Sequence, residues 1–196
     1  FLDFFDVKEE KLQLVKQIYD VQKKYLIPAN EAAKYADIYV GIPFCKGRCS
    51  YCSFFSADCD KNKDLIDCYI DNLVKEIKCV IGIIDKKGYI INSIYVGGGT
   101  PTSLAPGKLE KALALLKTVT AKEFTVEAGR PDSISAQMLD MLAKNNVSRI
   151  SINPQTVNEG TLKLIGRAHS IQDFYNAFDI AKKYSFIIIA TSISFY

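Results

Sequence analysis

The sequence is poor in histidine, a residue that many metal sites use. It has one histidine, His169, and no second closely spaced cysteine pair, which argues against structural zinc with four Cys or His ligands. No apolar run approaches the roughly 20 residues of a membrane span, and no charged and then apolar leader opens the chain. The net charge is only +3 and the lysines are scattered, so nucleic-acid binding gains no support. We therefore expect a cytoplasmic protein without a membrane span or a nucleic-acid partner.

The composition is that of a globular protein. With 196 residues, 48% of them hydrophobic and 24% charged, the chain can bury one good core. Six cysteines without a signal peptide indicate a reducing compartment, where disulfides are unfavourable. The chain starts at Phe1 rather than at a methionine and stops at Tyr196 within an apolar run. Because a domain normally ends outside its core, we expect a fragment of a longer protein.

The chain is organised around a cysteine-rich loop. An apolar, β-branched run at 38–42 predicts a short buried strand, and Pro43 breaks it before Cys45, Cys49 and Cys52. Incidental core cysteines would not crowd three into eight positions. Three thiolates on one loop can hold three irons of a 4Fe-4S cluster and leave the fourth iron open for a ligand that is not protein.

Strands and helices alternate through the rest of the chain. Strands are predicted at 38–42, 92–100, 124–128, 149–153 and 186–193, and helices at 8–26, 63–81, 106–116, 136–143, 158–166 and 171–181. This order predicts an α/β fold of parallel βαβ units that curl toward a TIM-like barrel. We divide the chain into an N-terminal helical segment, 1–37, which leads from a missing region, and a core, 38–196, that is incomplete at its C-terminus. In such folds the carboxyl ends of the strands carry the site.

Two candidate ligand groups lie at predicted strand ends. Gly97, Gly98 and Gly99 can bring backbone amides and carbonyls close to a charged small molecule. A flexible turn is the alternative, but the position of the glycines one strand after the cysteine loop favours a ligand role. Glu127 ends the third strand and could accept hydrogen bonds from a ribose or an ammonium group. The alternative is an exposed acid or one paired with Arg130.

Other polar residues carry weaker signals. Gln155 ends the fourth strand and Arg167 follows the short helix, but by themselves they are ordinary loop residues. His169 could relay protons, yet a surface or cap-adjacent imidazole explains it equally well, so we assign it no catalytic role. The cysteines outside the loop, Cys59, Cys68 and Cys79, are interpreted as ordinary thiols. No catalytic residue is assigned.

Four stretches carry a resemblance to a known family: IPFCKGRCSYCSF, YVGGGTPTSL, FTVEAGRPD and RISINPQT with LKLIGRAH. They resemble the radical S-adenosylmethionine (SAM) superfamily, in particular the oxygen-independent coproporphyrinogen III oxidase-like proteins of the HemZ type. The resemblance implies a partial TIM-like (βα)6 barrel, here truncated after about five strands.

The resemblance also implies roles for individual residues. Cys45, Cys49 and Cys52 would hold the 4Fe-4S cluster. Tyr39, Gly98 and Glu127 would contact cluster-bound SAM, with Gly97 in the same glycine segment, and Tyr51, Gly99, Thr100, Gln155 and Arg167 would contact a second SAM.

The implied activity is oxidative decarboxylation of coproporphyrinogen III to protoporphyrinogen IX, started by a radical from SAM and supplied with electrons by flavodoxin or ferredoxin. A haem chaperone is the alternative within the family, and an iron-sulfur electron-transfer or structural module is a more distant one. Two departures from the family pattern matter. The well-studied oxidases carry a further cysteine where this chain has Phe54, which bears on the substrate. The family has an aspartate where this chain has Ser192, which, together with the missing C-terminal substrate region, bears on whether the fragment alone is active.

Overall fold

The computed structural model describes residues 7–190, which divide into two units between Tyr35 and Ala36. The N-terminal unit contains the helix α2 (Glu9–Gln22) and two short 3-10 turns, η1 (Lys23–Tyr25) and η2 (Ala32–Lys34). Glu9 and Glu10 lie in the first turn of α2, where acidic side chains interact favourably with the helix dipole. No residue of α2 is buried, so this helix contributes nothing to the core of its own unit.

The second unit is built on a five-stranded sheet in the order β1-β4-β5-β6-β7. Its strands are β1 (Tyr35–Ile42), β4 (Ile90–Gly98), β5 (Ala121–Glu127), β6 (Arg149–Ser151) and β7 (Ile187–Ile189). The pairs β4–β5, β5–β6 and β6–β7 are all parallel, which confirms the predicted α/β class with about five strands. Because parallel neighbours end on the same side, their carboxyl ends form one edge for a site.

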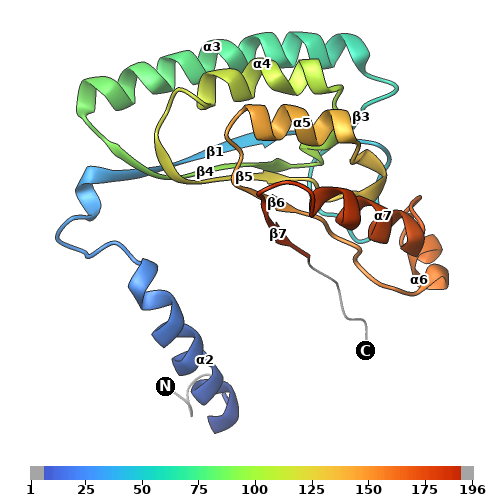
Figure 1. Ribbon diagram of the computed structural model, residues 1–196, viewed down its shortest axis with the longest axis horizontal. Helices are drawn as coiled ribbons and strands as arrows, with labels where there is room; N and C mark the ends of the chain where they lie inside the picture. Colours follow the sequence, from blue (N-terminus) through green and yellow to red (C-terminus); the bar gives the residue numbers. More distant parts are fainter. Residues whose placement is uncertain (1–6, 191–196) are drawn as a thin grey trace. The chain divides into compact units, whose positions relative to one another are not determined.

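Helices connect the strands and cover the sheet. They are α3 (Lys63–Lys87), α4 (Pro106–Leu116), α5 (Ala136–Lys144), α6 (Glu159–Leu164) and α7 (Ile171–Ala181), with 3-10 turns η3 (Pro101–Ser103) and η4 (Pro131–Ser133) at two strand ends. Figure 1 shows α3, α4 and α5 side by side along one face of the sheet. The hydrophobic core between them includes Ile42, Ile94, Val126 and Ile150, one residue from each of β1, β4, β5 and β6.

Helix ends follow the local chemistry of the sequence. The Ser135 hydroxyl accepts the Met138 amide at the start of α5, and Ser170 forms a capping box with Asp173 at the start of α7. Helix α3 runs six residues beyond the predicted end at Ile81, because the helix continues through Gly82 and is closed only at Gly88, whose φ of 66° is left-handed. Boundaries set by capping residues were therefore predictable, while the end of α3 depended on a glycine further along.

One small element was not predicted. The two-residue strands β2 (Phe44–Cys45) and β3 (Ala57–Asp58) pair in parallel across the cysteine loop. The predicted fifth strand corresponds to β7, but its positions 191–193, including Ser192, lie outside the described residues. Within residues 7–190, no helix is long and apolar enough to cross a membrane.

Candidate functional site

The cysteine loop is closed at its base by the β2–β3 pair. The Ala57 amide donates to the Pro43 carbonyl (2.8 Å) and the Cys59 amide to the Cys45 carbonyl (3.1 Å). At its tip, the Ser50 amide donates to the carbonyl of Ile165, directly after α6 (3.0 Å). These backbone hydrogen bonds fix the base and the tip of the loop that carries the three thiols.

The loop forms one wall of a cavity of about 200 Å³ at the carboxyl ends of the strands. The cavity is lined by all three loop cysteines and by Tyr51, Gly98, Gly99, Thr100, Glu127, Gln155 and Arg167, together with Gly47, Arg48, Phe54, Ser56, Gly129, Arg130 and Asn153. Of the predicted site residues, only Tyr39 and Gly97 do not line it. Residues more than 100 positions apart in the sequence therefore meet at the predicted edge of the sheet.

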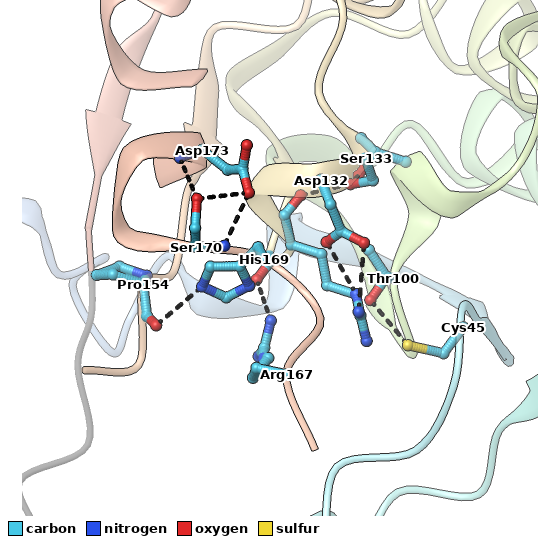
Figure 2. Close-up of polar contacts among 12 residues, drawn as sticks. Cys45, Thr100, Asp132, Ser133, Pro154, Arg167, His169, Ser170 and Asp173 are labelled. Carbon is cyan, nitrogen blue, oxygen red and sulfur yellow. Dashed lines mark hydrogen bonds and ion pairs between the residues drawn. The ribbon is translucent and has the colours of Figure 1, made fainter. Parts of the chain in front are cut away.

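The glycine segment has a packing role that the sequence did not reveal. Gly98 has a φ of 112°, and a Cβ on Gly99 would lie only 2.4 Å from the Phe44 carbonyl oxygen. The Gly99 amide donates to the Ile42 carbonyl (2.9 Å) and the Thr100 amide to the Phe44 carbonyl (2.8 Å). These two amides are used within the chain, so the glycines bring the cysteine loop against the end of β4. The Thr100 Oγ1 then lies 3.2 Å from the Cys45 Sγ (Figure 2).

Glu127 is held by a tyrosine that the sequence analysis missed. The Tyr95 hydroxyl donates to Glu127 Oε1 (2.6 Å), and its ring stacks on Tyr39 with centroids 6.0 Å apart. Burial and the Glu127 carboxylate raise the pKa of Tyr95 above its usual value, which keeps the phenol protonated as a donor. A Cβ on Gly97 would lie 3.0 Å from Glu127 Cδ. Tyr39 and Gly97 thus lie behind Glu127, away from the cavity lining.

The alternative pairing of Glu127 with Arg130 does not occur. Arg130 instead donates to Asp132, from Nε to Oδ1 (3.1 Å) and from Nη2 to Oδ2 (3.3 Å). The chain turns into η4 directly after Arg130, so that the guanidinium reaches forward along the chain to Asp132. The only sequence signal for this pair was the spacing of Arg130 and Asp132 within RPD.

Gln155 and Arg167 occupy constrained positions beside the loop. Gln155 is buried and has a φ of 67°, a left-handed conformation that is strained for a residue with a side chain and that is enriched at functional sites. Arg167 donates from Nη1 to the Gly129 carbonyl (3.0 Å) and from Nη2 to the Tyr51 hydroxyl (3.1 Å). Arg167 therefore links the end of β5 to the cysteine loop.

His169 lies outside the cavity lining. It is buried, with 3% of its surface exposed, and its Nε2 is 3.3 Å from the Pro154 carbonyl oxygen (Figure 2). The expected surface position is therefore wrong, while its place next to the Ser170 cap agrees with the alternative. Burial and the nearby Arg167 lower the pKa of the imidazole.

The remaining cysteines lie outside the cavity lining. Cys59 is buried, and burial together with the nearby Cys45 raises its pKa to about 11. Cys68 and Cys79 are exposed on α3.

The arrangement of this site agrees with one family of proteins. Residues 39–195 match the Radical SAM superfamily, which is most of the chain and includes the complete cavity lining. The chain belongs to the radical SAM superfamily. The resemblance of its motifs to this family is confirmed.

Named relatives of this radical SAM chain include an oxidase-like protein and heme chaperones. It is 31% identical over 183 residues to the oxygen-independent coproporphyrinogen-III oxidase-like protein HemZ of Bacillus subtilis, covering 91% of this chain and 36% of that protein. It is 34% identical over 163 residues to the heme chaperone HemW of the same organism, covering 80% and 41%. The chain thus spans roughly two fifths of the length of these relatives.

A solved structure supports the fold. The radical SAM enzyme coproporphyrinogen III oxidase (HemN) from Escherichia coli superposes with a TM-score of 0.70 at 24% identity, over 81% of this chain and 37% of that one. At this identity the likeness shows the fold alone, and it confirms the predicted TIM-like radical SAM architecture in partial form.

Membership of the radical SAM superfamily implies a 4Fe-4S cluster and SAM, and the thiols of the cysteine loop fit the cluster. Three free thiols, Cys45, Cys49 and Cys52, line one cavity. Within residues 7–190, no three Cys, His, Asp or Glu side chains are placed to hold a single metal ion. A cluster has a different requirement, because each thiolate binds a different iron. The donor set therefore suits a cluster better than one ion.

Proposed function

We propose that this chain is the SAM-binding part of an enzyme that decarboxylates coproporphyrinogen III to protoporphyrinogen IX without oxygen. The observation that carries this proposal is the cavity in which the three cysteines face the ends of β4, β5 and β6. An electron-transfer or structural module would need the cysteines but not the Glu127–Tyr95 contact or the constrained Gln155.

In this proposal the chain binds and orients SAM. Cys45, Cys49 and Cys52 hold the cluster, whose chemistry when bound is the reductive cleavage of SAM into a radical that takes a hydrogen from substrate. Glu127, fixed by Tyr95, presents a carboxylate oxygen that can accept a hydrogen bond from a ribose hydroxyl or the methionyl ammonium. The Gly98 backbone lines the same wall of the cavity.

A second SAM would occupy the side of the cavity next to the loop tip. Tyr51, Gly99, Thr100, Gln155 and Arg167 line that part of the site in this proposal. The contact between Arg167 and Tyr51 supports it, because the cation lies where the carboxylate of a small molecule could be paired. Equilibrium dialysis with labelled SAM measures the number of SAM molecules bound per cluster. We expect two, and a value of one would contradict the second SAM.

A haem chaperone is the second candidate, and a specific residue favours it. Phe54 lines the cavity and is 58% exposed, at the position where the well-studied oxidases carry a further cysteine. Several relatives with 30–38% identity are named heme chaperones. An exposed aromatic ring beside the cluster loop could contact the face of a tetrapyrrole.

The deciding experiment compares both activities in the full-length protein that contains this chain. It is incubated anaerobically with SAM, a flavodoxin or ferredoxin reductant and coproporphyrinogen III, and protoporphyrinogen is measured beside haem binding. We expect decarboxylation that requires SAM and is lost in Cys49→Ala. Haem binding without any decarboxylation would replace the oxidase proposal with the chaperone.

A further inference from the structure

A buried arginine beside the cysteine loop belongs neither to the cluster ligands nor to the residues assigned to SAM. Arg130 is 2% exposed and is among the largest fully buried side chains of the described residues, yet it lines the same cavity as the three cysteines. A buried guanidinium normally has all its donors paired, since each unpaired N–H forfeits its hydration. In Arg130, only some of these donors are paired.

The contacts of Arg130 leave one nitrogen without an acceptor. Nε and Nη2 donate to Asp132, but Nη1 is buried and has no partner among residues 7–190. The backbone is fixed as well, because the Arg130 carbonyl accepts from the Ser133 amide (2.9 Å) and the Ser133 hydroxyl (2.7 Å). Thr102 holds that hydroxyl from the other side, so Arg130 is anchored with one donor free.

The surroundings of Arg130 indicate which acceptor is missing. Arg130 lines the same cavity as Cys45, Cys49 and Thr100, and the Thr100 hydroxyl contacts the Cys45 sulfur (Figure 2). Burial alone would lower the pKa of Arg130, but Asp132 and the thiols of Cys45 and Cys49 hold it above its usual value. The acceptors that suit Arg130 Nη1 are therefore the cysteine sulfurs of this cavity. These sulfurs carry negative charge when the cysteines bind iron.

We infer that Arg130 is a positioning residue that donates from Nη1 to a sulfur of the cluster site and supplies its buried positive charge. Three thiolates and a reduced cluster place net negative charge in a cavity partly shielded from water, where a fixed cation acts strongly. By stabilising the more negative, reduced state, Arg130 makes one-electron reduction easier. Asp132 orients the guanidinium and opposes part of its charge.

This inference rests on the cluster at the three cysteines but not on the tetrapyrrole substrate. The test is a mediated redox titration of the full-length protein with its cluster reconstituted, followed by EPR, without SAM. Arg130→Gln should shift the midpoint potential to a more negative value, and Arg130→Lys, which keeps the charge, should shift it less. Asp132→Asn should shift it in the opposite, positive direction.

Arg48 provides the matched control. It lines the same cavity but is exposed, so Arg48→Gln removes an equal charge that water already screens, and we expect a much smaller shift. If Arg130→Gln fails to fold, Asp132→Asn still tests the inference through its expected positive shift of the midpoint potential. The Asp132 carboxylate is partly exposed, so we expect this variant to fold.

Four results would overturn the inference. Equal shifts in Arg48→Gln and Arg130→Gln would show a general charge effect. An unchanged potential with weakened SAM binding in Arg130→Gln would assign Nη1 to the SAM carboxylate instead. A parent protein that holds no cluster would overturn both this inference and the proposed function, whereas a parent cluster with a potential that neither variant alters would overturn this inference alone.

Discussion

Glu127 depends at the scale of single residues on the hydroxyl of Tyr95. Tyr95→Phe keeps the ring that stacks on Tyr39 but removes the donor to Glu127 Oε1. A hydrogen bond to a charged group that is partly exposed contributes about 1 kcal/mol, so we expect SAM affinity to fall about fivefold. Calorimetric titration of the reconstituted protein with SAM measures this effect.

Tyr69 offers a control with the same chemical change. Its hydroxyl donates to the Gly41 carbonyl (2.5 Å) and joins α3 to β1, away from the cavity lining. Tyr69→Phe should lower the free energy of unfolding by about 1 kcal/mol and leave SAM affinity unchanged. Equal SAM affinities of the parent and Tyr95→Phe would show that Tyr95 does not position Glu127.

His169 predicts a pH dependence of stability. Burial, with Arg167 and Arg130 nearby, lowers its pKa in the folded state, although the Pro154 carbonyl and Asp132 act in the other direction. Between the lowered pKa and the ordinary value of about 6.5, the unfolded chain binds a proton that the folded chain does not. The contribution of His169 is therefore present above about pH 6.5 and is lost as the pH falls through the lowered pKa.

The measurement is denaturant unfolding of the parent and His169→Gln at several pH values. Because His169 is the only histidine, the difference between the two proteins isolates its titration from that of the carboxylates. We expect the stability of the parent to fall more steeply between about pH 7 and 5 than that of the variant. Parallel curves would contradict the lowered pKa.

At the scale of elements, the site depends on close contact between the end of β4 and the cysteine loop. A Cβ at Gly99 would lie 2.4 Å from the Phe44 carbonyl oxygen, and this oxygen cannot move away without weakening the hydrogen bond that it accepts from the Thr100 amide (2.8 Å). Gly99→Ala should therefore lower the free energy of unfolding by about 2 kcal/mol or more. It should also lower the amount of cluster that the loop retains.

Gly107 is the matched control for this substitution. It lies in the first turn of α4, and a Cβ there would meet no atom within 4 Å. Gly107→Ala should raise stability by about 0.5–1 kcal/mol, because alanine is the better helix former. Thermal unfolding of both variants compares them directly, and a harmless Gly99→Ala would refute the close contact.

At the scale of the whole molecule, the six cysteines separate into two sets. Cys45, Cys49 and Cys52 line the cavity, whereas Cys59, Cys68 and Cys79 do not. Changing the first set to alanine should abolish iron and sulfide incorporation during anaerobic reconstitution. Changing the two exposed thiols, Cys68 and Cys79, should leave the content of about four irons per chain intact.

Iron and sulfide analysis with EPR compares these variants with the parent. Cys59 is left in place in the control because it is buried in the core, so that its removal would test packing as well. Unchanged cluster content in the triple variant would refute the cluster site.

Much of this molecule follows from the sequence alone. The alternation of strand and helix patterns predicted the parallel α/β unit, and capping residues such as Ser135 and Ser170 marked where helices begin. The spacing of the three loop cysteines predicted their joint role. These features depend on neighbours within a few positions, where the backbone geometry of helices, strands and turns sets the distances.

The tertiary structure decided which atoms meet across the cavity. It paired Tyr95 with Glu127 and Arg130 with Asp132, and it left Nη1 of Arg130 without a partner. It also engaged the Gly99 amide in a hydrogen bond to the Ile42 carbonyl, within the chain. Apart from the local pair of Arg130 and Asp132, these contacts join segments that are far apart in the sequence, by 32 residues for Tyr95 and Glu127 and by 116 for Arg167 and Tyr51. These contacts follow from the order and register of the strands. No local sequence pattern encodes that order or register, because many different strand pairings are compatible with the same alternation of apolar and polar residues.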